Sequence, residues 1–159
     1  MWQIPASSAI SPVAVSNEEG DWVVSVRGAS SGTCPDCLHY STSRHGWSYR
    51  SLQDLPVQGK AVTLRLQLSR WRCAYRQCKR QTFTEELPTI ASPYARRTTR
   101  VPEIVGLLGH STGGRSGQRL IQRLGMSISD DTILRHLKRS VSRVDDLPSA
   151  RIIGIDDWS

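Results

Sequence analysis

The chain of 159 residues is long enough for one or two small domains with modest hydrophobic cores. Its formal net charge of +7 indicates a polyanionic partner, of which nucleic acid is the simplest. No apolar run reaches the length of a membrane span and no secretory signal is recognisable, so we expect no membrane association and a soluble, cytoplasmic protein with reduced cysteines.

The N-terminal half of the chain predicts short β-strands. Residues 1–21 are small, polar and rich in Ser and Pro, and we expect them to be disordered. Residues 22–27 are rich in β-forming side chains and predict a first strand. Residues 44–56 predict a second short strand, which bends at Pro56.

The clearest strand covers residues 62–69. Aliphatic and polar side chains alternate there, and a period of two predicts one apolar and one polar face. The apolar set is Val62, Leu64, Leu66 and Leu68, and the polar set is Thr63, Arg65, Gln67 and Ser69. The strand continues to Cys73, and a return strand begins at Phe83, so strands flank the cysteines.

The four cysteines fall in two close pairs, Cys34 and Cys37 in a CxxC spacing and Cys73 and Cys78 in a CxxxxC spacing. Two such turns can supply the four thiolates of a structural Zn²⁺ site, which leaves no open position for catalysis. Two disulfides, or a redox-active CxxC, are the alternatives on spacing alone. Strands with two metal-binding turns predict a zinc ribbon over residues 22–90, which is too small to fold without its metal.

From residue 94 onward the apolar period becomes helical, after a Pro-containing boundary at residues 88–93. Glycines at 113 and 114 predict a break between the first helix and the second, and Ser129 is a good N-cap for a third. The side chains expected to face inward are Val101, Ile104, Val105 and Leu108, then Gly117, Leu120, Ile121 and Leu124, then Ile133, Leu134, Leu137 and Val141. The predicted fold class is therefore α+β: a small β-rich zinc ribbon, a three-helix helix-turn-helix domain over residues 94–144, and one unpaired terminal strand.

Basic residues concentrate in this helical part. Ten Lys or Arg and three acidic residues lie between residues 94 and 143, which leaves the remainder of the chain formally neutral. A helix-turn-helix places its last helix in the major groove of double-stranded DNA and the preceding helix across the backbone. The candidate DNA contacts are Thr132, Arg135, His136, Lys138 and Arg139 on the third helix, and Arg119 and Arg123 on the second. A plain three-helix bundle with a basic surface is the alternative.

Residues 150–159 form a continuous apolar stretch that ends in Asp156 and Asp157. Its isoleucines are typical of a strand that is buried on both faces, but no further strands follow to cover it. We therefore expect the chain to be truncated at the start of a further domain.

These features together resemble the ISL-three family of bacterial insertion-sequence transposases, from about Trp22 onward. The matching stretches are Cys34-Pro35-Asp36-Cys37, Asp54-Leu55-Pro56, Arg70-Trp71-Arg72-Cys73 with Cys78, Phe83-Thr84-Glu85, Leu87-Pro88, Tyr94-Ala95-Arg96-Arg97-Thr98, Arg119-Leu120, Arg123-Leu124-Gly125, Asp131-Thr132-Ile133-Leu134-Arg135 and Gly154-Ile155-Asp156-Asp157-Trp158. The resemblance implies a bacterial, nucleoid-associated protein with a zinc ribbon, a helix-turn-helix that recognises terminal inverted repeats in DNA transposition, and a C-terminal RNase H-like domain. Three carboxylates of that last domain bind two divalent metals for DNA strand cleavage and joining.

On this resemblance, Asp156 is the first carboxylate of a DDE-type catalytic triad. Mg²⁺ would bind only if the full catalytic domain were present, so we expect no strand cleavage by this chain alone. The ribbon is then expected to position the helices or to join the subunits of a homo-oligomer.

Two other functions are compatible with the sequence. One is a free-standing zinc-ribbon/helix-turn-helix transcriptional regulator. The other is a ribbon that stacks RNA or single strands on Trp47, Tyr49 or Trp71, side chains that otherwise fill the core of so small a unit.

Overall fold

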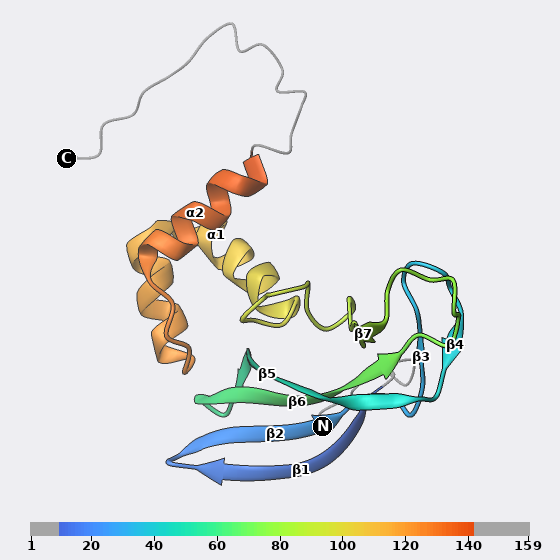
Figure 1. Cartoon of the computed structure of the whole chain (residues 1–159). Helices are drawn as coiled ribbons and strands as arrows, with labels where there is room; N and C mark the ends of the chain where they lie inside the picture. Colours follow the sequence, from blue (N-terminus) through green and yellow to red (C-terminus); the bar gives the residue numbers. More distant parts are fainter. Residues whose placement is uncertain (1–9, 142–159) are drawn as a thin grey trace, which may run out of the picture.

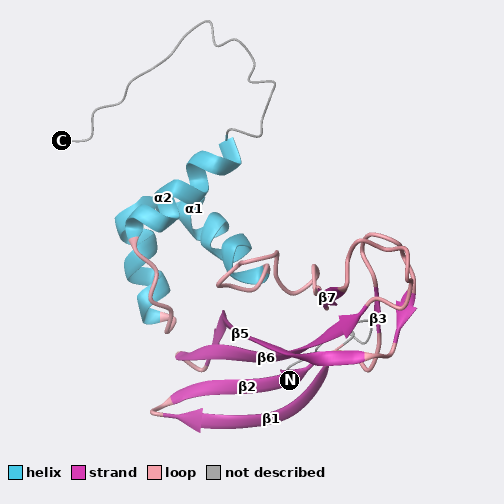
Figure 2. Ribbon diagram, viewed as in Figure 1, coloured by secondary structure: helices cyan, strands magenta, loops and turns pink. Residues whose placement is uncertain are grey.

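The computed structural model describes residues 10–141 as a β-sheet region followed by two helices (Figure 1). In chain order the elements are β1 (Ser11–Glu18), β2 (Asp21–Arg27), β3 (Gly32–Thr33), β4 (Tyr40–Ser41), β5 (Arg44–Val57), β6 (Lys60–Arg72), β7 (Thr82–Thr84), α1 (Arg100–Arg123) and α2 (Asp130–Val141). The strands and the helices occupy separate parts of the molecule, and the loop between β7 and α1 joins them (Figure 2).

The main sheet has the order β1-β2-β6-β5, and β7 pairs with the end of β6. Strands β1 and β2 form one antiparallel hairpin, and β5 and β6 form another. The two hairpins meet through β2 and β6, which are parallel, with Val24 opposite Leu64. The short β3 and β4 form a separate two-stranded sheet. The predicted strands at 22–27, 44–56 and 62–69 are therefore confirmed as β2, β5 and β6.

Both hairpins turn through two residues with positive φ. These are Glu19 (53°) and Gly20 (94°) between β1 and β2, and Gln58 (54°) and Gly59 (72°) between β5 and β6. Paired positive φ angles match the twist of an antiparallel hairpin, and glycine adopts them without steric cost. The expected disorder is thus wrong for residues 11–18, because their backbone pairs with β2 although every side chain of β1 is exposed.

The alternation predicted for residues 62–69 is confirmed up to Leu68, whereas Ser69, expected on the polar face, is fully buried. Its four aliphatic side chains, Val62, Leu64, Leu66 and Leu68, are at most 4% exposed. They form a core with Val24 and Val26 of β2 and Leu52 of β5, which the strand register places on the same face. The loop after β7 covers this face, with Leu87 and Ala91 buried against it.

The helical part contains two helices, so the predicted three-helix helix-turn-helix fold class is wrong. The expected break at Gly113 is a kink inside α1, where Gly113 has φ 72° and ψ −173°. A single glycine turns the chain there, and the helix resumes at Gly114 without an intervening loop. The terminal strand predicted over residues 150–159 lies outside the described residues.

Small residues on α1 let α2 approach closely. A Cβ atom at Gly109 would lie 2.7 Å from Cγ2 of Ile133, which is fully buried. Three leucines that were expected to face inward are exposed instead: Leu120 at 42%, Leu124 at 47% and Leu134 at 42%. The core between the helices consists of Val101, Val105, Ile121, Met126, Ile128 and Ile133.

A buried carboxylate joins the sheet to the helices. Asp54, near the end of β5, is 0% exposed, accepts a 2.7 Å hydrogen bond from Thr98 Oγ1 and forms an ion pair with Arg100 at the start of α1. Backbone hydrogen bonds run beside it, from Gln53 N–H to Arg96 O at 3.0 Å and from Thr98 N–H to Gln53 O at 3.0 Å. Residues 54–56 and 94–98, two of the stretches that carried the family resemblance, therefore meet at this junction.

The far end of α1 also contacts the sheet. A Cβ atom at Gly125 would lie 2.5 Å from the carbonyl oxygen of Gly59, in the turn between β5 and β6. Leu55, which follows Asp54, packs against the core of the helices. The sheet therefore contacts the helical part at both ends of α1.

Replacement of Asp54 by Asn should destabilise the fold. The amide can accept from only one of the two donors and loses the charge that Arg100 faces, which should lower the free energy of unfolding by about 1.5–3 kcal/mol. Urea denaturation followed by circular dichroism measures this. The matched control is Glu18→Gln, which removes the 2.8 Å ion pair with Arg65 between two half-exposed side chains and should cost less than about 1 kcal/mol. Equal costs for the two variants would contradict the role of Asp54.

Candidate metal centre and basic surfaces

Each cysteine pair lies on a tight turn. In the first knuckle (Cys34–Cys37), the N–H of Leu38 donates to Cys34 O at 2.9 Å. In the second knuckle (Cys73–Cys78), the N–H of Cys78 donates to Tyr75 O at 3.1 Å. The β3–β4 hairpin carries the first knuckle, and the second follows the end of β6, as the sequence predicted.

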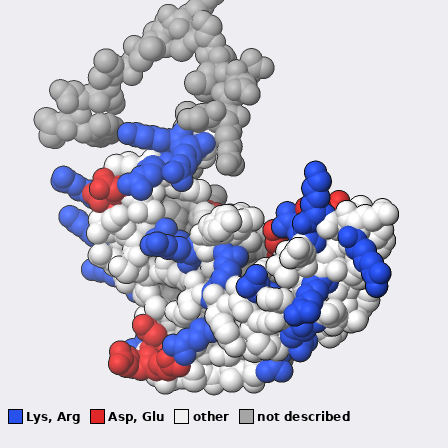
Figure 3. All heavy atoms as spheres, in the orientation of Figure 1, with Lys and Arg blue, Asp and Glu red and all other residues white. Residues whose placement is uncertain are grey.

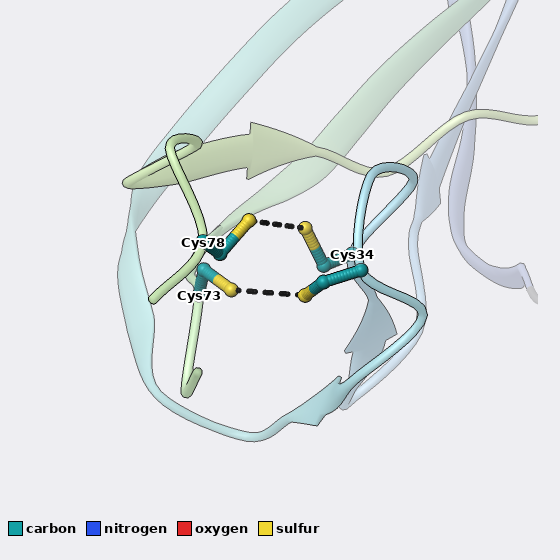
Figure 4. Close-up of side chains that lie close together, drawn as sticks. Cys34, Cys73 and Cys78 are labelled. Carbon is teal, nitrogen blue, oxygen red and sulfur yellow. Dashed lines mark hydrogen bonds between the residues drawn. The ribbon is translucent and has the colours of Figure 1, made fainter. Parts of the chain in front are cut away.

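The four sulfur atoms lie within 4.8 Å of one another. The Sγ atoms of Cys34 and Cys78 are 3.9 Å apart and those of Cys37 and Cys73 are 3.4 Å apart (Figure 4). A tetrahedral zinc ion with Zn–S bonds of about 2.3 Å sets its sulfurs about 3.8 Å apart, so the spacing fits one ion bound by all four. A disulfide needs about 2.0 Å, and the four cysteines are free, so the geometry excludes the two-disulfide alternative.

Other contacts also join the two knuckles. Asp36 of the first knuckle forms a 2.8 Å ion pair with Arg80, just after the second. His39 stacks on Tyr75, with ring centroids 4.4 Å apart and planes 7° from parallel. The small core behind the sulfurs consists of Cys34, Trp71 and Phe83. The sequence reasoning missed the stacked pair, although its signal was an aromatic ring two residues after one cysteine of each pair.

The cysteine thiols of the site differ in pKa. Burial opposes ionisation of Cys34, but backbone hydrogen bonds from Cys37 and Asp36 outweigh it and lower the pKa of this thiol from 9.0 to about 7. At Cys73 a backbone hydrogen bond at Tyr75 favours the thiolate, but burial and the neighbouring thiols outweigh it and raise the pKa to about 12. At Cys78 a backbone hydrogen bond at Arg80 favours the thiolate, but burial and a neighbouring thiol outweigh it and also raise the pKa, so zinc has one readily ionised ligand and must displace protons from at least two others.

The predicted DNA contacts on α2 fall into two groups. Three are exposed: Arg135, Lys138 and Arg139. The other two are half-buried and already engaged. Thr132 Oγ1 lies 3.0 Å from Ser129 Oγ at the start of the helix, and His136 packs on α1, where a Cβ at Gly106 would lie 3.0 Å from its Nε2.

The second half of α1 carries the remaining two, Arg119 and Arg123, both exposed. They line a hollow of about 600 Å³ together with Ser116, Leu120 and Gln122. Lys and Arg side chains are spread over the helices and over much of the sheet region, and the largest acidic patch in this view lies at the turn between β1 and β2 (Figure 3). Within residues 10–141 no helix is long and apolar enough to cross a membrane.

Three aromatic side chains were candidates either for the core or for stacking on nucleic acid. Trp71 is fully buried, whereas Trp47 is 36% exposed and Tyr49 is 70% exposed. Core filling is therefore confirmed for Trp71 and wrong for Tyr49. Asp156, the predicted catalytic carboxylate, lies outside the described residues.

Two cysteine knuckles on neighbouring β-hairpins, with four sulfurs around one point, define a zinc ribbon with a structural Zn²⁺ bound by Cys34, Cys37, Cys73 and Cys78. Residues 30–78 match the family model described as the zinc-finger of transposase IS204/IS1001/IS1096/IS1165. Over these residues the match confirms the resemblance to the ISL-three transposases that was seen in the sequence. No curated protein and no solved structure matches the chain.

Removal of zinc by a chelator should unfold the ribbon before the helices, because the core behind the sulfurs contains only three residues. Far-UV circular dichroism and tryptophan fluorescence, recorded with the zinc released, should show loss of strand signal and exposure of Trp71. Cys78→Ser should behave like the stripped protein, and Ser30→Ala, an exposed position before the first knuckle, should not. An unchanged far-UV spectrum after complete metal loss would show that zinc does not stabilise the ribbon.

Zinc affinity should fall as the pH falls. Cys73, with a pKa raised to about 12, and Cys78, with a pKa raised above 9.0, must each lose a proton to bind zinc at neutral pH, and Cys34, with a pKa of about 7, adds a further competing proton below pH 7. Competition with a chromophoric chelator across this range measures the effect, and the decline should steepen on the acid side of pH 7. A constant affinity would mean that protons do not compete for these sulfurs.

Proposed function

We propose that this chain is the DNA-binding N-terminal region of an ISL-three transposase and that it recognises the terminal inverted repeats of its insertion sequence. The observation that carries the proposal is the match of residues 30–78 to a transposase zinc ribbon. The charge of residues 94–143, where ten Lys or Arg accompany three acidic residues, supports double-stranded DNA as the partner.

We assign base reading to α2. Its two acidic residues, Asp130 and Asp131, lie in the first turn, where negative charge favours the helix dipole, and beyond them the helix carries only basic charges. Arg135 and Arg139 are four residues apart, so they lie on one exposed side of the helix. An arginine can bind guanine with two hydrogen bonds in the major groove. His136, which packs on α1, has the role of positioning this helix.

We assign phosphate binding to the second half of α1. Arg119 and Arg123 are also four residues apart and exposed, and they share a hollow in which both can reach an external anion. The planar guanidinium group matches the oxygens of a phosphate, but phosphate contacts carry no sequence information. In this proposal α1 therefore supplies affinity and α2 supplies specificity.

Replacement of Arg135 by Gln should cost about 1–3 kcal/mol of binding free energy on an inverted-repeat duplex and much less on a shuffled duplex, because only the former presents the base that Arg135 reads. Fluorescence anisotropy with both duplexes measures this. The control is Arg27→Gln, which removes an exposed arginine of β2. For the unmodified chain, log K should fall with log salt concentration by roughly 0.9 per phosphate contacted.

Two results would contradict these assignments. A uniform loss on both duplexes would assign Arg135 to phosphate binding. A flat salt response, or no preference of the unmodified chain for the inverted repeat, would reject recognition of the repeats by this region.

A further inference from the structure

The second knuckle carries an unusual concentration of positive charge. Residues 55–84 contain seven Lys or Arg and no acidic residue. The net charge of the chain outside residues 94–143 is formally zero and does not reveal this concentration. The acidic residues that balance the positive charge lie elsewhere, for example at the turn between β1 and β2. The expectation that the ribbon positions the helices or joins subunits, and is not the main DNA reader, rested on that net charge.

Four basic side chains surround a hollow of about 430 Å³ directly beside the second knuckle. We call His45, Arg72, Arg76 and Arg80 the knuckle surface. The hollow is also lined by hydroxyl and amide groups, from Tyr75, Thr82 and Gln81. Guanidinium, hydroxyl and amide donors that converge on a polar hollow are suited to an anion with several oxygen acceptors.

The arginines of the knuckle surface differ in whether they form an ion pair within the protein. Arg80 forms the ion pair with Asp36, and the hydrogen bond between these side chains raises the pKa of Arg80. Arg72 and Arg76 are exposed, and neither forms an ion pair among residues 10–141. Their charges are therefore open to an external ligand.

Charge balance of the metal site is the competing explanation. A zinc ion with four thiolates has a net charge of about −2, which nearby cations can offset. Arg80 is suited to that role, since it lies two residues after Cys78 and its ion pair with Asp36 joins the two knuckles. Arg72 and Arg76 lie on the solvent side, where water screens such an interaction.

We propose that the knuckle surface binds phosphates of the DNA backbone, as a second contact with the same duplex that the helices engage. This inference rests on the proposed function and adds to it a second binding surface. Asp54 and Gly125 both lie where the helices contact the sheet, so in this proposal a duplex bound by the helices extends to the knuckle surface. Backbone contacts of this kind contribute affinity independently of sequence.

The test uses the zinc-loaded full chain with the double substitution Arg72→Gln and Arg76→Gln. The slope of log K against log salt should become shallower by up to about 1.8, with equal losses on inverted-repeat and shuffled duplexes, because two phosphate contacts are removed. The control is Arg27→Gln with Arg65→Gln, which removes the same charge from exposed positions on the main sheet and should leave the slope nearly unchanged. The variant Arg72→Lys with Arg76→Lys should recover most of the slope.

A separate helix variant, Arg135→Gln with Arg139→Gln, distinguishes the two proposals. If this variant loses its preference for the inverted repeat while the knuckle variant matches its control, phosphate binding by the knuckle surface is rejected and the proposed function stands. If the unmodified chain shows no preference for the repeat but the knuckle variant still loses affinity, the proposed function fails and the knuckle surface stands. Losses confined to single-stranded DNA or RNA would overturn the duplex assignment.

A measurement on the unmodified chain covers the case in which the knuckle variant loses zinc. Arginine-specific chemical modification followed by mass spectrometry should show that bound duplex protects Arg72 and Arg76 but not Arg27. Unprotected Arg72 and Arg76 under saturating DNA would overturn the proposal.

Discussion

The arrangement of the whole molecule depends on the buried carboxylate of Asp54. It lies near the end of β5, inside the protein, and two donors from beyond the loop, Thr98 and Arg100, satisfy it. A carboxylate excluded from water is tolerated only when such partners are in place, so the sheet and the start of α1 must assemble together. The Asp54 contacts consequently join the zinc ribbon to the basic helices. They also set where the Lys and Arg side chains of the ribbon lie relative to those of the helices.

Zinc has a more local role than this junction. It joins two turns that already contact each other through the Asp36–Arg80 ion pair and the stacked rings of His39 and Tyr75. The metal compensates for the three-residue core behind the sulfurs, whereas the larger core on β6 is packed without it. We therefore expect metal removal to affect the ribbon end of the sheet more than the opposite end, next to the helices.

Features with a local cause could be predicted from the sequence. The alternation on β6, the four cysteine ligands and the inward positions of Val105 and Ile133 follow from side-chain period and spacing. The errors arise where a distant partner decides. Ile133 and Leu137 of α2 pack against Gly109 of α1, a contact between two helices that the apolar period does not reveal, and Leu120 is exposed although the period placed it inward. The junction at Asp54 pairs residues 44 positions apart, a distance that no local pattern reveals.

The parallel pairing of β2 with β6 has a consequence for how the chain folds. Trp22 lies opposite Val62, so β2 cannot complete its place in the sheet until β6 exists, and the first knuckle lies within the intervening loop. Closing so long a loop costs entropy, whereas the β5–β6 hairpin closes locally. A zinc ion captured by the two knuckles would shorten the loop that β2 must close. During synthesis, β2 therefore joins the sheet only after β6 has been made, and zinc binding by the cysteines that follow β6 would favour this step.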